Sequence, residues 1–350
     1  MNKTILVINS GSTSLKYKLF VVGKNLREQQ SGYIENIGAG KVKNHDQALQ
    51  QALQEINDLD SIVAVGHRVV HGGEEFTEPI KIGRRVVDKL QQYNKLAPLH
   101  NPANIQGIKA CLKLLPGVPN VAVFDTGFHR NIPEKAYRYA LPEKYYKQHK
   151  IRRYGFHGIS YQYVVGQAMQ TKLKKKPRAK IIACHLGGGC SVSASVGGKS
   201  IDTSMGFTPL EGLIMMSRSG DLDPGVVLFL QRELKMSAQK VDELLNKESG
   251  IYGLAGEKDW LKLLQKMRRG NKKAQLAFDM FCYRIKKYIG AYYAALGGLD
   301  GLIFTGAIGS GDATTRRKIC AGLPFLQNVP VMAIKTDEEK MIAQEVIKKI

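Results

Sequence analysis

Cysteine is scarce in this sequence, and its spacing matches no familiar use. No two of the five cysteines form a Cys-x-x-Cys pair, which excludes the common zinc sites and argues against a disulfide framework. An odd number of scattered thiols is typical of a reducing compartment, so we expect a cytoplasmic protein. The cysteines are Cys111, Cys184, Cys190, Cys282 and Cys320.

Long apolar runs are also missing. No stretch of about 18 apolar residues occurs, so the sequence predicts no membrane-spanning helix. Lys3 is the only basic residue before the first short apolar run, and a polar loop follows that run at once, so we expect no cleaved signal peptide. The 350 residues are 43% hydrophobic, enough to bury a large core, and this length suits two domains.

Acidic residues are few for a chain of this size. There are 30 of them against 52 Lys and Arg, giving a formal net charge of +22. The densest basic segments, 172–180 and 266–273, have no interleaved aromatics and match no nucleic-acid motif. We therefore interpret them as solvated surface and expect no nucleic-acid partner. The positive charge also suits a protein whose ligands are anions.

The chain opens with a polar turn between two apolar segments, ILVINSGSTSLKYKLF over residues 5–20. Apolar residues alternate after the turn, which predicts strand, turn and strand rather than a Walker-type loop leading into a helix. In such a turn, backbone N–H groups and the hydroxyls of Ser12 and Ser14 can bind phosphate. Asn9 could contribute an amide oxygen to a metal and Lys16 a cation. A polar turn that only closes a hairpin is the alternative.

A second copy of this pattern follows later in the chain. The segment IIACHLGGGCSVSASV, within 178–202, again has an apolar run, a glycine turn and alternating residues. A third apolar run, in 298–312, also ends in a turn of small residues. Two copies of one unit predict two domains of like topology whose loops converge on one cleft.

Between the two copies, segment 101–115 predicts a helix. Asn101 would begin it, and Pro102 would occupy the first helical position.

Four motifs carry a family resemblance: HRVVHGG (67–73), FDTGFH (124–129), GFHGISY (155–161) and DTSMGFTPLEGL (202–213). With them the sequence resembles the acetate kinases, of the acetate/propionate/butyrate kinase family within the sugar kinase–Hsp70–actin superfold. The likeness runs over residues 4–317 and resumes at 329–346.

The resemblance implies an α/β fold of two duplicated ribonuclease H-like domains with an interdomain active-site cleft. The N-terminal domain would span 1–150 and be joined by a C-terminal helix at 337–350. The nucleotide-binding domain would span 151–336. Because the family is dimeric, we expect a homodimer.

The implied reaction is reversible phosphoryl transfer from ATP to acetate, giving acetyl phosphate and ADP. A transferred phosphoryl group spreads negative charge over its oxygens, so catalysis requires positioning and cations. Arg68 and Arg218 match the two active-site arginines, and His157 matches the histidine that stabilises the transition state. Asp125 matches the active-site acid or base. Because acetate is already ionised at neutral pH, we expect Asp125 to orient a partner rather than remove a proton.

The resemblance also implies Mg²⁺, with Mn²⁺ as a substitute, held by Asn9 and Glu338. Glu338 would lie in the first turn of a helix capped by Thr336 or Asp337. Leu99, Phe156 and Pro209 match the small apolar acyl pocket, although ordinary core packing would explain the same residues. The residues that match ATP/ADP contacts are Lys16, Ser12, Ser14, His185, Leu186, Gly187, Gly188, Gly189, Asp259, Ala307, Ile308, Gly309, Ser310 and Gly311.

The sequence departs from the family mainly where adenosine would bind. Gly188, Ser310 and Gly311 replace family Asn, Glu and Asn residues, and Leu261 stands in place of an arginine. Compared with typical members of the family, this sequence is shorter and lacks much of the segment that lies between positions 317 and 329. These changes leave open propionate or butyrate as substrate and another phosphoryl donor such as pyrophosphate. An inactive homologue that binds anions or nucleic acid is a further alternative.

Overall fold

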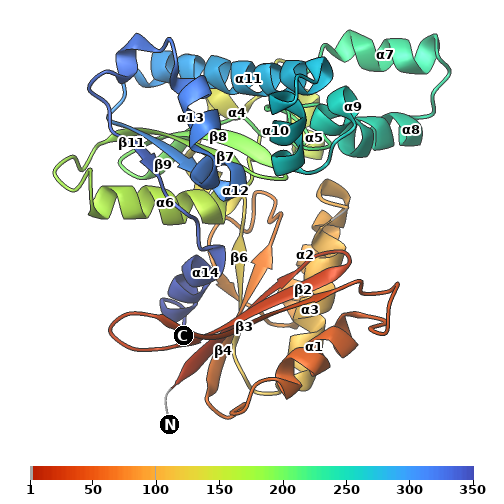
Figure 1. The fold of residues 1–350 in the computed structure, drawn as a ribbon. Coiled ribbons are helices and arrows are strands. Elements are labelled where there is room, and N and C mark those ends of the chain that lie inside the picture. The colour runs from red at the N-terminus through yellow and green to blue at the C-terminus, as the bar shows by residue number, and fades with distance from the viewer. Residues whose placement is uncertain (1–2, 99) are drawn as a thin grey trace. The chain divides into compact units, whose positions relative to one another are not determined.

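A computed structural model describes residues 3–98 and 100–350 of the chain (Figure 1). The chain divides into two compact units. Unit 1 consists of the chain up to Arg130 together with Gly158–Tyr163 and Asp337–Ile350, and unit 2 consists of Asn131–His157 and Val164–Thr336. The predicted domain boundary at residue 150 stays a prediction.

Unit 1 is built on a mixed six-stranded sheet in the order β3-β2-β1-β4-β6-β5. The opening hairpin, β1 and β2, is antiparallel, as the alternating pattern predicted, and β3 continues it. On the other side β1, β4 and β6 run parallel. The strands are β1 (Thr4–Ser10), β2 (Ser14–Val21), β3 (Arg27–Glu35), β4 (Ile62–Val69), β5 (Ile80–Lys81) and β6 (Asn120–Phe124).

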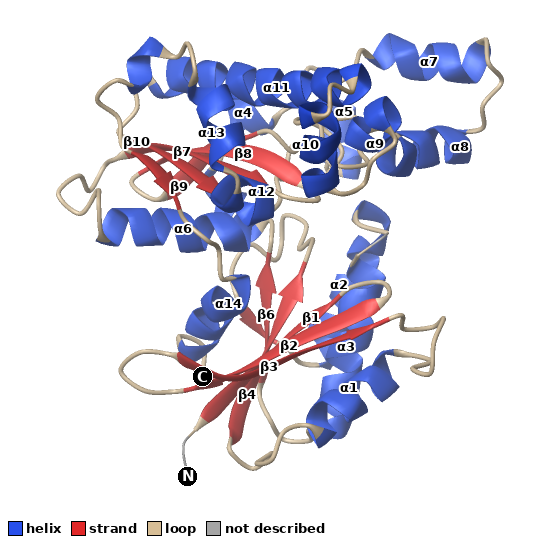
Figure 2. Ribbon diagram, in the orientation of Figure 1, coloured by secondary structure: helices blue, strands red, loops and turns tan. Residues whose placement is uncertain are grey.

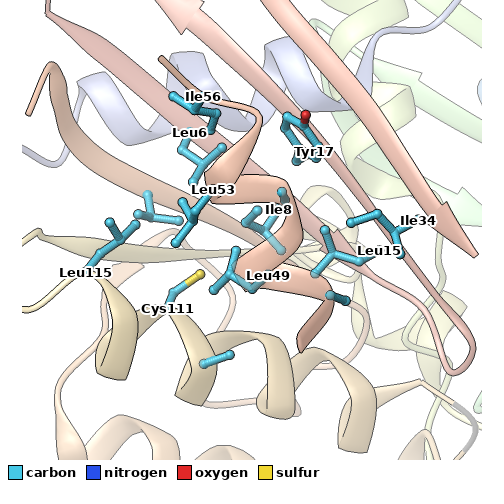
Figure 3. Packing of buried hydrophobic residues seen from close by; sticks show 14 of the residues in the cluster. Leu6, Ile8, Leu15, Tyr17, Ile34, Leu49, Leu53, Ile56, Cys111 and Leu115 are labelled. Atoms are coloured by element: carbon cyan, nitrogen blue, oxygen red, sulfur yellow. The ribbon is translucent and has the colours of Figure 1, made fainter. Parts of the chain in front are cut away.

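Alternate residues of β1 face opposite sides of this sheet and enter two separate cores. Leu6 and Ile8 pack against helices α1 (His45–Gln54) and α3 (Asn101–Leu114), as Figure 3 shows for the residues that it labels. Ile5 and Val7 face α14 (Glu338–Ile347). Both sides of β1 are therefore buried, which fixes the strand end that carries Asn9. The other helices of this region are α2 (Arg84–Gln92), η1 (Tyr93–Leu96) and η2 (Gly127–Asn131).

Unit 2 has a five-stranded sheet in the order β11-β10-β7-β8-β9. β7, β8 and β9 are successive antiparallel strands, while β10 and β11 run parallel to β7. This repeats the arrangement of β1, β2 and β3 with β4 and β6, so the predicted duplicated α/β fold is confirmed. The strands are β7 (Lys180–Leu186), β8 (Cys190–Val196), β9 (Lys199–Thr203), β10 (Gly301–Thr305) and β11 (Val331–Ala333).

Helices account for most of the rest of unit 2 (Figure 2). The longest is α11, whose 25 residues bury Phe281, Ile285 and Ile289. Of the helices formed by the described residues, none combines the length and apolar character needed to span a bilayer. The helices are α4 (Glu134–Tyr137), α5 (Glu143–His149), α6 (Gly158–Gln170), α7 (Pro224–Arg232), α8 (Ala238–Glu243), η3 (Leu244–Glu248), α9 (Gly250–Ala255), α10 (Trp260–Arg268), α11 (Lys272–Leu296), α12 (Gly306–Gly311), α13 (Ala313–Cys320) and η4 (Pro324–Leu326). Residues 158–163 of α6 belong to unit 1.

Two local predictions were wrong. Helix α3 begins at Asn101, as predicted, but Pro102 is its second residue rather than its first. The Asn101 side chain accepts from the backbone N–H of His71 and donates to its carbonyl, which ties α3 to the end of β4. The segment of small residues after β10 is the short helix α12, not a turn.

Candidate active site

Three parallel strands of unit 1 end at one edge of the sheet, and charged side chains meet there. Arg68 lies near the end of β4, while Asn9 and Asp125 lie at the ends of the neighbouring β1 and β6. Arg68 donates from Nη2 to Oδ2 of Asp125 at 2.5 Å and from Nη1 to Oδ1 of Asn9 at 3.4 Å. The structure therefore brings together three predicted site residues that are distant in the sequence.

Glu338 completes this cluster from α14. Its Oε2 lies 3.9 Å from Nε of Arg68. Burial opposes the positive charge of Arg68, but the Asp125 and Glu338 carboxylates outweigh it and raise the pKa of Arg68. Burial raises the pKa of Glu338 to about 7, although Arg68 acts to lower it. The cluster thus holds a permanent cation and a carboxyl group whose charge changes near neutral pH.

The first turn of α14 sets the position of Glu338. Asp337 caps the helix by accepting from the backbone N–H of Lys340 at 3.2 Å, which confirms one of the two predicted caps. Glu339, the next residue, is 4% exposed and binds Nζ of Lys16 at 2.8 Å. Lys16 faces Asn9 across the hairpin, so this ion pair fixes Lys16 at the same sheet edge.

The oxygens around Arg68 suit a hard divalent cation. Oδ1 of Asp125 is buried and has no hydrogen-bond partner among the described residues, and Asn9 and Glu338 offer further oxygens. In the part of the chain that the structure describes, no three His, Cys, Asp or Glu side chains gather closely enough to hold a metal by themselves. Mg²⁺ usually takes few protein oxygens and completes its octahedron with water and phosphate. The donor set fits Mg²⁺ on these terms.

In unit 2, His157 packs against the sheet through its side chain. It precedes Gly158 and has a left-handed backbone, with φ of 59°. Its Nδ1 lies 2.8 Å from the hydroxyl of Ser191 on β8. Its ring stacks on His185 of β7, with centroids 4.1 Å apart. Strands β7 and β8 therefore both fix this imidazole.

Arg218 approaches the glycine turn between β7 and β8. Its Nη1 donates to the carbonyl of Pro209 at 3.1 Å, and no carboxylate pairs with it within the described chain. Burial lowers the pKa of Arg218. The backbone N–H of Met216 donates to the carbonyl of Gly188 at 3.3 Å, which joins the Arg218 loop to the glycine turn. A partly buried arginine without a carboxylate partner is suited to bind an anionic ligand.

The segment 306–311 meets the same glycine turn. Gly306 has a positive φ of 77°, and a side chain there would overlap the backbone of Leu186. Ala307, Ile308 and Gly309 follow in α12, beside Leu186 and Gly187. The Ser310 hydroxyl donates to the carbonyl of Gly306 at 2.7 Å, inside the helix.

The remaining predicted site residues either make contacts within the fold or lie outside the described residues. Asp259 caps α10 by accepting from the backbone N–H of Lys262 at 2.9 Å. Phe156 is buried next to His157, and Pro209 contacts Arg218 through its carbonyl. Leu99 lies outside the described residues.

The sequence predictions missed two contributors. Glu339 and Ser191 support Lys16 and His157, respectively. The sequence signals for these two residues were only a run of acidic residues after Thr336 and a serine shortly after the glycine turn. Neither signal reveals which side chain the residue contacts.

Comparison with known proteins identifies the family. The family model described as the Acetokinase family matches residues 4–345. The chain belongs to the acetokinase family. It is 43% identical to an acetate kinase of Treponema denticola, covering 97% of this chain and 98% of that protein. The aligned region spans 389 positions, more than the 350 residues here, so that relative carries residues that this chain lacks.

Solved structures agree with this assignment. The chain matches the acetate kinase of Porphyromonas gingivalis with a TM-score of 0.93 and 39% identity, covering 99% of each chain. It matches a propionate kinase of Francisella tularensis with a TM-score of 0.89 and 38% identity, over 99% of this chain and 100% of that one. A ROK family protein of Streptococcus pneumoniae, at 11% identity and a TM-score of 0.50, over 99% of this chain and 98% of that one, shares only the fold.

Proposed function

We propose that this protein transfers the terminal phosphoryl group of ATP to acetate, reversibly giving acetyl phosphate and ADP. The observation that carries the proposal is the partly buried Arg68 cluster, with Asn9, Asp125 and Glu338, in a chain of the acetokinase family. Membership implies a kinase whose acceptor is a carboxylate and whose co-substrates are ATP and ADP.

The transfer is direct and in line. A carboxylate oxygen of acetate attacks the γ-phosphorus, the bond from that phosphorus to the bridging oxygen breaks, and ADP leaves with the electron pair. Arg68 and Arg218 neutralise the carboxylate and the phosphoryl oxygens, and His157 donates a hydrogen bond to the developing charge. Asp125 orients Arg68, which the 2.5 Å contact supports, and no proton has to be removed from acetate.

A magnesium ion, replaceable by manganese, would be held by Asn9 and Glu338, and it would supply positive charge to the phosphate oxygens. The phosphates are bound by the hydroxyls of Ser12 and Ser14, by Lys16 and by the glycine turn 187–189. His185, Leu186 and Asp259 contribute on the nucleotide side together with segment 307–311.

The acyl group is short. Phe156 and Pro209 bound it in unit 2, which their places beside His157 and Arg218 support, and Leu99, outside the described residues, stays a third predicted contact. An added methylene changes binding in such a pocket by only about 1–3 kcal/mol, so propionate and butyrate are weaker substrates rather than excluded ones. The similarity to a propionate kinase favours this second activity.

A hydroxamate assay of acyl phosphate formation tests the function with acetate, propionate and butyrate, each with Mg²⁺ and ATP. Arg68→Ala should lower kcat by roughly 10²–10³-fold, because a preorganised cation is lost. Arg85→Ala, which removes an exposed arginine of α2, is the matched control and should retain full activity. Absence of turnover with all three acids would contradict the proposal.

The phosphoryl donor is the part most open to change. Leu261 is 67% exposed, and the Ser310 hydroxyl is bonded within α12, so neither side chain is engaged as a family arginine or glutamate would be. We therefore expect the protein to select the nucleotide base less strictly, so that GTP or pyrophosphate can also serve as the phosphoryl donor. Comparing KM for ATP, GTP and pyrophosphate tests this, and strict use of ATP would contradict it.

We further propose a cytoplasmic homodimer. The five cysteines are free thiols, as expected in a reducing compartment. Helix α7 buries none of its residues, and its Val226, Leu228 and Phe229 are about half exposed. Such an apolar helix surface suits contact with a second copy. Light scattering after size-exclusion chromatography measures the oligomeric state.

A further inference from the structure

Ser191 lies beside His157 but belongs to none of the predicted site residues. It is fully buried on β8, and its backbone pairs with that of His185 on β7. Its hydroxyl oxygen is 2.8 Å from Nδ1 of His157. The same strand pair therefore supplies the ring that stacks on His157 and the hydroxyl that contacts one of its nitrogens.

The other ring nitrogen of His157 faces the glycine turn. A Cβ built on Gly189 would lie 3.2 Å from Nε2 of His157 and 3.7 Å from Nη1 of Arg218. The surface of Gly189 is thus the point where the histidine and the partly buried arginine converge. This is where a phosphoryl group would meet both donors.

A neutral imidazole carries its hydrogen on only one nitrogen, and the partner of the other nitrogen decides which. A serine hydroxyl can donate or accept, so it can adapt to either tautomer. A hydrogen bond from His157 to phosphoryl oxygen requires the hydrogen on Nε2. That tautomer leaves Nδ1 as an acceptor, and Ser191 is placed to donate to it.

We propose that Ser191 is a positioning residue that donates to Nδ1 of His157 and so keeps the hydrogen on Nε2, facing Gly189 and Arg218. This rests on the proposed phosphoryl transfer for its catalytic meaning. Without the hydroxyl, the ring populates both tautomers and loses orientation. Only one of those tautomers can donate toward the phosphoryl group.

The direct test is the tautomer itself. Two-bond ¹H–¹⁵N spectra of the full chain labelled with ¹⁵N-histidine, at pH 7.5, distinguish a protonated from an unprotonated ring nitrogen, and the His157→Asn variant assigns the signal. We expect Nε2 of His157 to be protonated and Nδ1 unprotonated in the natural sequence. Ser191→Ala should move both nitrogens toward the averaged shifts of a tautomer mixture. A hydrogen on Nδ1 in the natural sequence would overturn the proposal.

Kinetics supply the second readout. Ser191→Ala should lower kcat by at least roughly tenfold with little change in KM for acetate, and Ser191→Thr, which keeps a hydroxyl, should recover most of it. Ser193→Ala is the matched control, because Ser193 is a buried serine on the same strand whose hydroxyl contacts Ser200 at 3.3 Å. Its ¹⁵N signals and kcat should match those of the natural sequence.

The two proposals can fail separately. If the natural sequence has no kinase activity, the spectra still decide whether Ser191 sets the tautomer. If activity is present but Ser191→Ala leaves both the spectra and kcat unchanged, the positioning role is wrong and the function stands.

Discussion

At the scale of single residues, Arg68 is the centre of the charged cluster in unit 1. Motif likeness predicted Arg68, Asp125, Asn9 and Glu338 as site residues, and the structure shows these four together. Their contacts could not be predicted from the sequence. Pairing of Arg68 with Asp125 depends on β4 and β6 being neighbours, which becomes visible only in the sheet.

Glu338 should make metal binding depend on pH. Its pKa is about 7 in the absence of metal, so a proton competes with the cation below that pH and is displaced when the cation binds. The affinity for Mg²⁺ or Mn²⁺ should therefore be nearly constant above pH 8 and fall by up to about tenfold per pH unit below pH 6. Titration calorimetry at pH 5.5, 6.5, 7.5 and 8.5, on the full chain with ADP present, measures it.

Two variants isolate the cause of this pH dependence. Glu338→Gln should weaken metal binding and remove most of its dependence on pH in this range. Glu345→Gln changes a buried glutamate further along α14, one that accepts from Gln162 at 2.8 Å, and should preserve the profile. An unchanged pH profile in Glu338→Gln would show that another group titrates.

At the scale of elements, the beginning of α14 links helix capping to the site. Asp337 caps this helix and also pairs with Nζ of Lys18 at 3.2 Å. Asp337→Ala removes the cap and should lower the free energy of unfolding by about 1 kcal/mol. Because Glu338 is the next residue, fraying of this turn should also raise KM for the magnesium–ATP complex. Urea unfolding and steady-state kinetics measure the two effects.

Asp337→Asn separates the cap from the charge. An asparagine oxygen still accepts from the Lys340 N–H but forms no ion pair with Lys18, so stability should stay within roughly 0.5 kcal/mol of the natural value. If Asn loses as much stability as Ala, the ion pair rather than the cap holds the helix.

Which elements could be predicted depended on the periodicity of their side chains. The alternation after Ser14 predicted β2 correctly, because one face of that strand is buried. The helix α12 was missed because Gly306, Ser310 and the small residues between them show no helical pattern. The start of α3 at Asn101 was predicted correctly, but the contact of that side chain with the His71 backbone was not, because it depends on how α3 packs against the end of β4.

At the scale of the whole molecule, the repeated hairpin was enough to predict the duplicated fold. Each copy begins a sheet with the same order of antiparallel and parallel partners. The sequence did not indicate every segment of the chain that makes up unit 1. This unit includes Gly158–Tyr163, whose membership depends on tertiary packing such as the bond from the Gly158 N–H to the Asp125 carbonyl at 2.9 Å.

The net charge of +22 should act on the rate at which anionic substrates arrive. A strongly positive molecule attracts ATP over distances comparable to the Debye length, which is about 10 Å at 0.1 M salt and shorter above it. Raising NaCl from 20 to 300 mM should therefore lower kcat/KM for ATP by roughly three- to tenfold while leaving kcat nearly constant.

Replacing the exposed Lys174 and Lys175 by Glu should reduce kcat/KM for ATP at low salt and flatten its salt dependence without lowering the melting temperature. If instead kcat/KM is indifferent to salt and to these reversals, the excess positive charge has no part in substrate capture, and retention of the chain on random duplex DNA at 150 mM NaCl would then assign the charge to a nucleic-acid partner.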